Sequence, residues 1–320
     1  MRILARRFGM TKVTVMNVVH RVVALVAGSV VVAAALTPKW SGVLAIDGKY
    51  VRVYDRLAGA FSPPKSARPG DGEHERPMPR HRAVWICGID CGTGDLPHYQ
   101  MAEEETKVDL VLYFRGLKAV GYPLRALVSD GNPDIVAAAR KVFGDSFVHQ
   151  RCTKHFADGM VRLVRQEEAP EKTEESMKLV RLVQSIVTAP DIAAAARRKT
   201  VLPHMPQETD VQRQIMRAYL ANEEALVAHL LHPEHRIPST TNEIENLFRQ
   251  LNLRLKSLGQ FRRWQNAEKY LNAWALLRRL TKYTDCRGER KLRNGKSPLE
   301  LAGVDVSHVD MFDLRSTNQQ

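Results

Sequence analysis

The stretch LRALVSDGNPDIVAAARKVFG, residues 124–144, decides the fold because it predicts a buried strand that leads directly into a helix. Its first part, Leu124–Asp130, is apolar and ends in an acid. Asn132 and Pro133 follow, and these residue types favour the N-cap and the first turn of a helix. A strand joined to a helix by so short a turn is typical of an α/β sheet.

Three further strands are predicted upstream of this unit. VLAIDGKYVRVY, Val43–Tyr54, is rich in β-branched residues and carries one acid, Asp47. AVWICGIDC, Ala83–Cys91, predicts the second strand, and a Gly-rich turn leads from it into a third strand at Leu96–Ala102. Between the first two strands, the Pro- and Gly-rich stretch Arg56–Arg82 shows no periodicity, so we expect a long loop to which no role is assigned.

The remaining elements complete an α/β order. An amphipathic helix is predicted at Lys107–Val120 and a fifth strand at Ser146–Gln150. Three strands followed by helix, strand, helix and strand is the order of the ribonuclease-H-like fold, a five-stranded mixed sheet with flanking helices. From His155 to Pro238 the pattern is almost purely helical, which predicts an all-helical insertion.

Two long helices are predicted after this insertion. The second covers Arg263–Leu280. The first begins after Thr241 and carries one apolar stripe. The residues of that stripe are Ile244, Leu247, Phe248, Leu251, Leu255 and Leu258.

Residues Ile3–Val23 predict the end of a helix-turn-helix, with a turn at Gly9–Thr11 and a second helix capped by Thr11. The apolar stripe of that helix is expected to contain Val13, Met16, Val19 and Val23. The candidates for contact with a DNA groove are Arg6, Arg7, Lys12 and Asn17. A complete unit needs another helix before Met1, so we expect a helix-turn-helix remnant, with an ordinary basic helical hairpin as the alternative.

The apolar run Val22–Leu36 follows a basic stretch and therefore resembles a secretory signal peptide. It is shorter than the ~20 residues needed to span a bilayer, so we expect a buried connecting helix and no membrane association. Four cysteines do not make a secreted disulfide framework and favour a reducing compartment. A cytoplasmic, nucleoid-associated protein is expected.

The charge of the chain is strongly positive and unevenly distributed. Forty-eight Lys and Arg against 35 Asp and Glu give a net charge of +13. Residues 1–21 contain only basic charges, and residues 249–296 hold 14 basic against three acidic side chains. Such basic ends favour a nucleic-acid partner. With 44% apolar residues the chain is globular, which excludes the disordered, collagen-like and disulfide-scaffold classes.

Two acids lie where metal-dependent chemistry is expected. Asp47 interrupts an apolar strand, where an unpaired carboxylate is unfavourable. Asp130 ends the fourth strand, at the edge where α/β sheets place ligand sites. In a ribonuclease-H-like sheet these two strands are neighbours, so the carboxylates are expected to lie close enough to share the pair of divalent cations used in phosphodiester chemistry. Each acid precedes Gly, so a turn-forming role is the alternative.

Glu245 is the third candidate acid because it borders the apolar stripe of its helix. Arg249, Asn252 and Lys256 follow on the same face, and basic and amide neighbours suit a metal beside a phosphate. The nearest competitor, Glu243, points roughly 200° away. The other acids near these motifs are read as structural or solvated, namely Asp90, Asp95, Asp134 and the run Glu103–Glu105.

At these residues the sequence resembles the DDE transposases of the Mutator-like (MULE) bacterial insertion-sequence family. The matching motifs are IDG at Ile46–Gly48, SDG at Ser129–Gly131, HQRCTKH at His149–His155 and TTNEIENLFRQ at Thr240–Gln250. The 115 residues between the second and third acids leave room for the helical insertion of this family. The segment Asn294–Gly303 resembles a tail common in integrases and transposases, so the resemblance spans nearly the whole chain.

The resemblance implies roles for individual residues. Asp47, Asp130 and Glu245 would be catalytic and hold two Mg²⁺ or Mn²⁺ ions. Cys152 and His155 match the Cys-x-x-His element, in which His155 would contact the scissile phosphate or support the site. The supporting residues expected are Arg249 and Asn252, and the further DNA-binding residues are Lys256, Arg262 and Arg263.

A zinc site made of Cys87, Cys91, Cys152 and His155 is an alternative for the cysteines. Cys87 and Cys91 are four steps apart on an extended strand, ~13 Å at ~3.3 Å per residue, which is too far to share one ion. A zinc site of this composition is therefore disfavoured.

The resemblance implies transposition: metal-dependent cleavage of transposon-end DNA and strand transfer into target DNA, by a homodimer or higher synaptic oligomer. The alternatives are a catalytically inactive, transposase-derived DNA-binding regulator and a structure-specific nuclease of the same fold. The expected domains are a partial helix-turn-helix and connecting helix (1–40), the first part of the core (41–155), the helical insertion (156–238), the core helices with the third acid (239–282) and a basic C-terminal tail (283–320).

Overall fold

The computed structural model describes residues 6–23, 26–53, 81–258, 261, 263–311 and 314. The loop expected at Arg56–Arg82 therefore lies outside the described residues, except that its last two residues belong to a strand. Arg262, one of the expected DNA-binding residues, also lies outside them.

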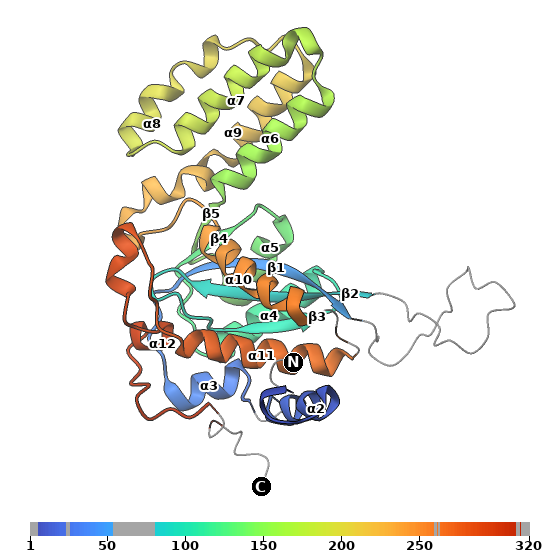
Figure 1. Cartoon of the computed structure of the whole chain (residues 1–320). Helices are drawn as coiled ribbons and strands as arrows, with labels where there is room; N and C mark the ends of the chain where they lie inside the picture. The colour runs from blue at the N-terminus through green and yellow to red at the C-terminus, as the bar shows by residue number, and fades with distance from the viewer. Residues whose placement is uncertain are drawn as a thin grey trace, which may run out of the picture.

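A five-stranded mixed sheet forms the centre of the molecule (Figure 1). Its order is β3-β2-β1-β4-β5, and its strands are β1 (Val43–Val53), β2 (His81–Asp90), β3 (Tyr99–Ala102), β4 (Ala126–Ser129) and β5 (Val148–Arg151). The strands β1, β2 and β3 pair antiparallel, whereas β1, β4 and β5 pair parallel. The predicted succession of strands and helices is confirmed, although β3 begins three residues later than expected.

Helices cover both faces of the sheet. Leu44 and Ile46 of β1 pack into a core that includes residues of α4 (Lys107–Ala119) and α5 (Pro133–Phe143). Val43 and Ala45 point to the other face and pack with residues of α10 (Asn242–Leu258) and α11 (Trp264–Leu280). Because both faces are buried, β1 is apolar at consecutive positions rather than at alternate ones.

The turn after β4 follows the predicted chemistry. Asn132 caps α5 by accepting a hydrogen bond from the backbone N–H of Asp134 (3.0 Å), and Pro133 is the first helical residue. Gly131 has a φ of 103°, a conformation that favours glycine. This turn leaves Asp130 exposed at the carboxyl edge of the sheet.

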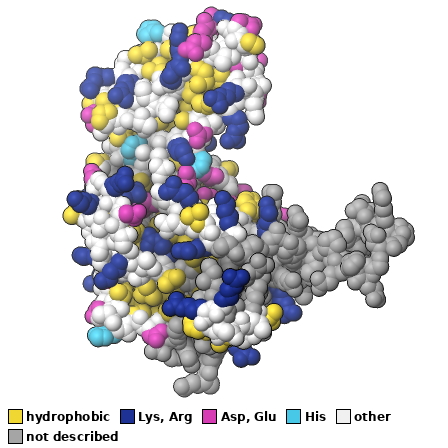
Figure 2. Space-filling model, viewed as in Figure 1, with side chains coloured by type: hydrophobic (Ala, Val, Ile, Leu, Met, Phe, Trp, Pro, Cys, Tyr) yellow, Lys and Arg dark blue, Asp and Glu magenta, His cyan; other side chains and the backbone are white. Residues whose placement is uncertain are grey.

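A helical bundle with its own core extends from this sheet (Figure 1). It comprises α6 (Thr153–Glu167), α7 (Thr173–Val187), α8 (Ile192–Lys199) and α9 (Asp210–Leu231), with 3₁₀ turns at Pro170–Lys172, Leu202–His204 and Pro233–His235. Gln150 of β5 attaches the bundle to the sheet: it donates to the carbonyl of Leu226 (3.1 Å) and accepts from the backbone N–H of His229 (2.8 Å). Lys and Arg side chains are spread over both the bundle and the sheet body on the face in Figure 2.

The N-terminal helix α2 (Lys12–Val23) begins where predicted, and Thr11 accepts a hydrogen bond from the backbone N–H of Thr14 (3.0 Å). The predicted apolar stripe was wrong at Val13, which is 66% exposed, whereas Val15 is buried. By helix geometry Val13 lies between His20 and Asn17 on the polar side of α2, whereas Val15 lies on the apolar side with Val19 and Val22, and α2 contacts α11.

The predicted run Val22–Leu36 is divided among the described residues. Val22 and Val23 end α2, and Ser29–Leu36 form a second helix, α3, which begins after Gly28, its N-cap. Val32 of α3 packs with Leu276 of α11, so the run is buried against the sheet's outer helix layer. None of the described helices is long and apolar enough to cross a membrane.

The C-terminal segment packs against the body through short elements. A 3₁₀ helix, η4, covers Gly288–Arg293, and α12 (Pro298–Leu301) follows it. Ser297 caps α12 by accepting a hydrogen bond from the backbone N–H of Glu300, and its own backbone N–H donates to the Glu300 carboxylate, which completes a capping box. This is the segment that resembles an integrase tail.

Candidate active site

The strand register brings Asp47 and Asp130 to the same edge of the sheet. Ala45 of β1 pairs with Val128 of β4 in a parallel ladder, and each acid lies two residues beyond its paired residue. Asp47 is half-buried and accepts a hydrogen bond from the backbone N–H of Gly48 (2.8 Å), whereas Asp130 is exposed. Two neighbouring parallel strands with acids at the same level therefore bring two carboxylates close together.

Glu245 approaches this pair from the first turn of α10. Burial, with smaller contributions from the negative charges of Asp130 and Glu245, raises the pKa of Asp47 to about 6 against the opposing hydrogen bond from Gly48 and the charge of His155. The charges of both other acids thus act on Asp47, so the three acids predicted from the sequence share one electrostatic environment.

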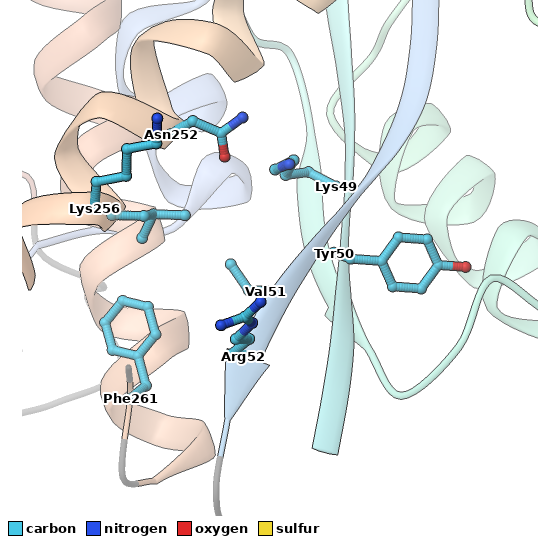
Figure 3. Close-up of a pocket in the computed structure, with 8 residues that line it drawn as sticks. Lys49, Tyr50, Val51, Arg52, Asn252, Lys256 and Phe261 are labelled. Atoms are coloured by element: carbon cyan, nitrogen blue, oxygen red, sulfur yellow. The ribbon is translucent and has the colours of Figure 1, made fainter. Parts of the chain in front are cut away.

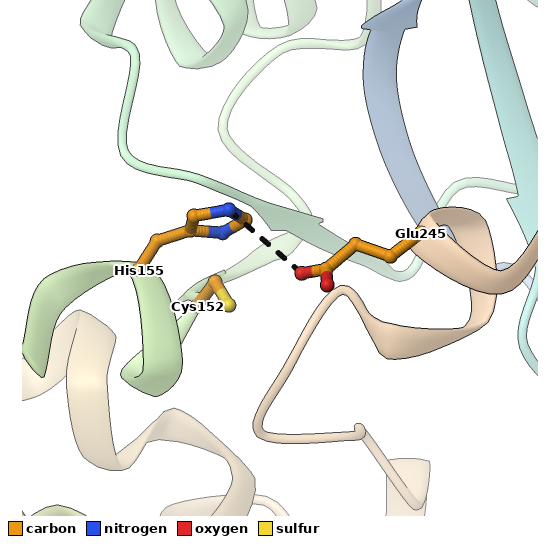
Figure 4. Close-up of side chains that lie close together, drawn as sticks. All are labelled: Cys152, His155 and Glu245. Atoms are coloured by element: carbon orange, nitrogen blue, oxygen red, sulfur yellow. Dashed lines mark ion pairs between the residues drawn. The ribbon is translucent and has the colours of Figure 1, made fainter. Parts of the chain in front are cut away.

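Two cations at the start of α6 hold Glu245 in place. Lys154 Nζ lies 2.9 Å from Glu245 Oε2, and His155 Nε2 lies 3.8 Å from Glu245 Oε1 (Figure 4). Partial burial opposes ionisation of Glu245, but these two cations lower its pKa below the ordinary value. Lys154 precedes His155 in the HQRCTKH motif, which is the signal that sequence reasoning overlooked.

Cys152 and His155 form a hydrogen-bonded pair beneath Glu245. The hydrogen bond to Cys152 raises the pKa of His155 to about 9, and the charges of Glu245 and Asp130 act in the same direction. Burial opposes ionisation of the Cys152 thiol, yet hydrogen bonds from His155 and Thr241 lower its pKa to about 7. His155 is therefore a cation at neutral pH, in contact with the acids.

Thr241 links these groups and was not singled out from the sequence. Its hydroxyl lies 3.4 Å from Cys152 Sγ, 3.3 Å from His155 Nδ1 and 3.2 Å from Glu245 Oε1. It directly precedes α10, so it fixes the first turn of the helix that carries Glu245. Its place in the Thr-Asn-x-x-Glu motif was the available signal.

Ligand-type atoms of Cys152, His155 and Glu245 lie within 4.8 Å of one another (Figure 4). Among the described residues, neither this group nor a second one on the surface includes Cys87 or Cys91. The structure therefore gives no support to a four-ligand zinc site that uses all of these cysteines.

Glu105, read from the sequence as structural or solvated, is a fourth acid near this site. A Cβ built on Gly48 would lie 2.4 Å from Glu105 Oε2, so the carboxyl rests directly on the backbone next to Asp47. Burial and, to a smaller extent, the charges of Asp47 and Asp130 together raise the pKa of Glu105 to about 7. No sequence pattern indicates this contact, because the loop before α4 reaches β1 only through the fold.

The acids that were set aside are otherwise structural. Asp90 accepts hydrogen bonds from Ser41, Thr93 and Tyr122, and buried Asp95 pairs with Arg279. Glu243 points away from Glu245 as expected and pairs with Arg290 and Arg293.

The residues predicted to support the site or to bind DNA lie in a pocket, in a groove and on the exposed surface. Arg249 lines a separate pocket with Glu243 and Arg293, and its expected supporting role stays a prediction. Asn252 and Lys256 line a groove between α10 and β1 (Figure 3). The side chains exposed elsewhere are Arg6, Arg7, Asn17 and Arg263, whereas the side chain of Lys12 lies outside the described residues.

A comparison with protein-family models gives a match. The model of the family described as Transposase, Mutator family, matches residues 85–281, which is more than half of the chain. No match was found among curated proteins. The matched region contains Asp130, His155 and Glu245 and the whole helical bundle between them.

Proposed function

The chain belongs to the Mutator family of transposases, and from this premise we propose that it is a DDE transposase that cuts transposon-end DNA and joins the cut end to target DNA. The single observation that supports this most is the convergence of Asp47, Asp130 and Glu245, which come from β1, β4 and α10. We also assign the sheet to the ribonuclease-H-like class, on the order and directions of its five strands.

The acids suit a pair of Mg²⁺ or Mn²⁺ ions. Carboxylate oxygens are the ligands that these hard cations prefer. The charges of Asp130 and Glu245 raise the pKa of Asp47, and those of Asp47 and Asp130 raise the pKa of Glu105. Cations bound among these groups would relieve that repulsion. When bound, they supply Lewis-acid activation of water and stabilisation of the phosphoryl charge in an in-line displacement.

The protein's own groups orient the acids and the DNA phosphate. Lys154 and His155 hold the carboxylate of Glu245, and Gly48 holds that of Asp47. His155, protonated at neutral pH, offers a positive charge to the scissile phosphate next to the exposed Asp130. In this proposal Glu105 supports the metal ligands from the opposite side of Gly48.

Plasmid cleavage tests the proposal. The full chain is incubated with Mg²⁺ or Mn²⁺ and a supercoiled plasmid carrying the DNA that flanks its gene. We expect nicked and joined products from the wild type, and at least a thousandfold loss in Asp47→Asn, Asp130→Asn and Glu245→Gln with DNA binding retained. Glu268→Gln, at an exposed position on α11, serves as the control.

Two outcomes would replace this function. Salt-sensitive DNA binding without any metal-dependent cutting would identify a transposase-derived regulator instead. Cutting without preference for the flanking DNA, and without joining, would identify a nuclease. A homodimer or higher synaptic oligomer, a helix-turn-helix remnant at α2, the expected domain boundaries and nucleoid association remain predictions.

A further inference from the structure

A groove of about 410 Å³ leads away from the acids between α10 and the outer half of β1 (Figure 3). Its lining includes Lys49 and Arg52 from β1, Asn252 and Lys256 from α10, and Phe261 after α10. Lys49 lies two residues beyond Asp47 on the strand, and Asn252 and Lys256 lie two and three helical turns beyond Glu245. The groove therefore begins where the acid site ends.

The groove carries positive charge that no acid among the described residues neutralises through an ion pair. Lys49, Arg52 and Lys256 contribute three cations, and none of its described lining residues is acidic. These three cations form no ion pair with a described acid, in contrast to Lys154, which pairs with Glu245. Cations without an acidic partner along a concave surface attract a polyanion, and a DNA strand presents one phosphate per nucleotide.

Phe261 adds an aromatic surface at the far end of the groove. Its backbone N–H donates to the carbonyl of Arg52 (3.3 Å), and its ring lies 5.5 Å from that of Tyr270, so the ring is held in place. It remains partly exposed toward the groove (Figure 3). A fixed ring inside a basic groove is a stacking platform for a nucleobase.

A paired base inside a duplex already stacks on its neighbours and offers no free face to Phe261. We propose that the groove binds an unpaired DNA strand, with phosphates on Lys49, Arg52 and Lys256 and a base on Phe261. The strand then runs from the groove to the phosphate that lies at the acids. This inference rests on the proposed DNA-cutting function and specifies the form of DNA that enters the site.

Fluorescence anisotropy in EDTA tests the inference without cleavage. The probes are a labelled 20-nucleotide oligo-dT and a labelled 20-base-pair duplex, both with the full chain. Phe261→Leu keeps an apolar side chain but removes the stacking face, and we expect about tenfold weaker binding of oligo-dT. Tyr50→Leu is the matched control, because Tyr50 borders the groove while its ring points away from it (Figure 3).

A double variant of surface lysines tests the phosphate contacts. Lys49→Gln with Lys256→Gln should weaken oligo-dT binding and reduce the slope of log affinity against log salt by about 1.4, since each lost contact to a single strand contributes about 0.7. Lys141→Gln with Lys178→Gln, at exposed positions on α5 and α7, removes the same charge elsewhere and should leave the slope within error. Changes of surface lysines leave the core intact, so the double variant tests binding of a strand to the groove even where Phe261→Leu lowers stability.

Two results would overturn the inference. One is oligo-dT affinity within twofold of the controls for both groove variants. The other is an equal loss for oligo-dT and duplex, which would assign the groove to a duplex backbone. A different combination separates the two proposals. If the wild type does not cut plasmid but the groove variants bind oligo-dT more weakly, the proposed function is wrong and the groove assignment stands.

Discussion

The folded protein favours the protonated form of Asp47 over its ionised form. Its pKa rises from 3.8 to about 6, first because it is buried and then because Asp130 and Glu245 are negative. The folded state therefore binds this proton more tightly than the unfolded state does. The associated stability is complete below pH 3.8 and is lost as the pH rises through about 6.

Asp47→Asn should accordingly stabilise the metal-free protein at pH 8, by about 1–3 kcal/mol, with a smaller gain at pH 5. Thermal or urea unfolding in EDTA at both pH values measures this difference. If Asp47→Asn were no more stable than the wild type at pH 8, the fold would not disfavour the ionised form of Asp47.

His155 should titrate near pH 9 because of its hydrogen bond to Cys152 and the acids around it. Replacing the thiol by Cys152→Ala removes that bond, so the pKa of His155 should fall by at least one unit. NMR titration of the imidazole Cε1–H signals, assigned with His155→Gln, measures both values. A His155 signal unaffected by Cys152→Ala would contradict the pairing.

Glu105 should influence metal binding without being indispensable for cleavage. Glu105→Gln is expected to raise the Mn²⁺ concentration needed for half-maximal cleavage by about tenfold, and to weaken Mn²⁺ binding in calorimetry to a similar degree. Glu103→Gln, exposed in the same acidic run, should behave as the wild type. Equal behaviour of the two variants would return Glu105 to a solvated role.

Among single residues, the sequence predicts those whose position follows from one element. Asp47 and Asp130 are foreseeable because each ends or interrupts an apolar strand, and two parallel strands share an edge. Glu105 is not foreseeable, because its contact with Gly48 depends on how a loop after β3 folds back over β1. For Arg249 the sequence gives only the face of α10, and the fold adds that this face also borders a pocket with Glu243.

The helix α11 is fixed to the sheet by a buried ion pair. Arg279 Nε and Nη2 donate to Asp95 Oδ1 and Oδ2 at 2.7 and 2.8 Å, and both side chains are fully buried. Trp40 Nε1 donates to the same carboxylate (2.8 Å). This pair holds the helix against the turn after β2, on the face of the sheet that α10 also covers.

Removing one partner of the Arg279–Asp95 pair should destabilise the fold more than replacing both partners by uncharged residues. Arg279→Ala leaves Asp95 buried without its cation and is expected to lower the free energy of unfolding by about 3–5 kcal/mol. Arg279→Met with Asp95→Asn should recover a large part of this loss. Denaturant titration measures both; a single variant as stable as the double variant would contradict the assignment.

The elements themselves were largely predictable, and the exceptions have a physical cause. Local patterns fix α5 through Asn132 and Pro133, and α10 through one apolar stripe. In α2 the position of Val13 lies between those of His20 and Asn17 on the polar side, whereas Val15 lies between Val19 and Val22 on the apolar side. The prediction therefore failed because the stripe was drawn about one position away from the centre of the apolar side, and Val15 rather than Val13 is buried.

At the scale of the whole molecule, three distant segments build one site. The strands supply Asp47 and Asp130, the start of the bundle supplies Lys154 and His155, and the helix after the bundle supplies Glu245. Gln150 fixes the bundle to β5, so both ends of the bundle meet the sheet beside the acids. The basic groove continues from this point along α10 (Figure 3).

The measurement that tests the central claim most directly is anomalous diffraction from crystals of the full chain grown with Mn²⁺. We predict manganese peaks within coordination distance of Asp47, Asp130 and Glu245, with a pair ~3.5–4 Å apart when DNA is bound. Peaks absent from these carboxylates, or confined to Cys152 and His155, would contradict the account of a two-metal DNA-cutting site.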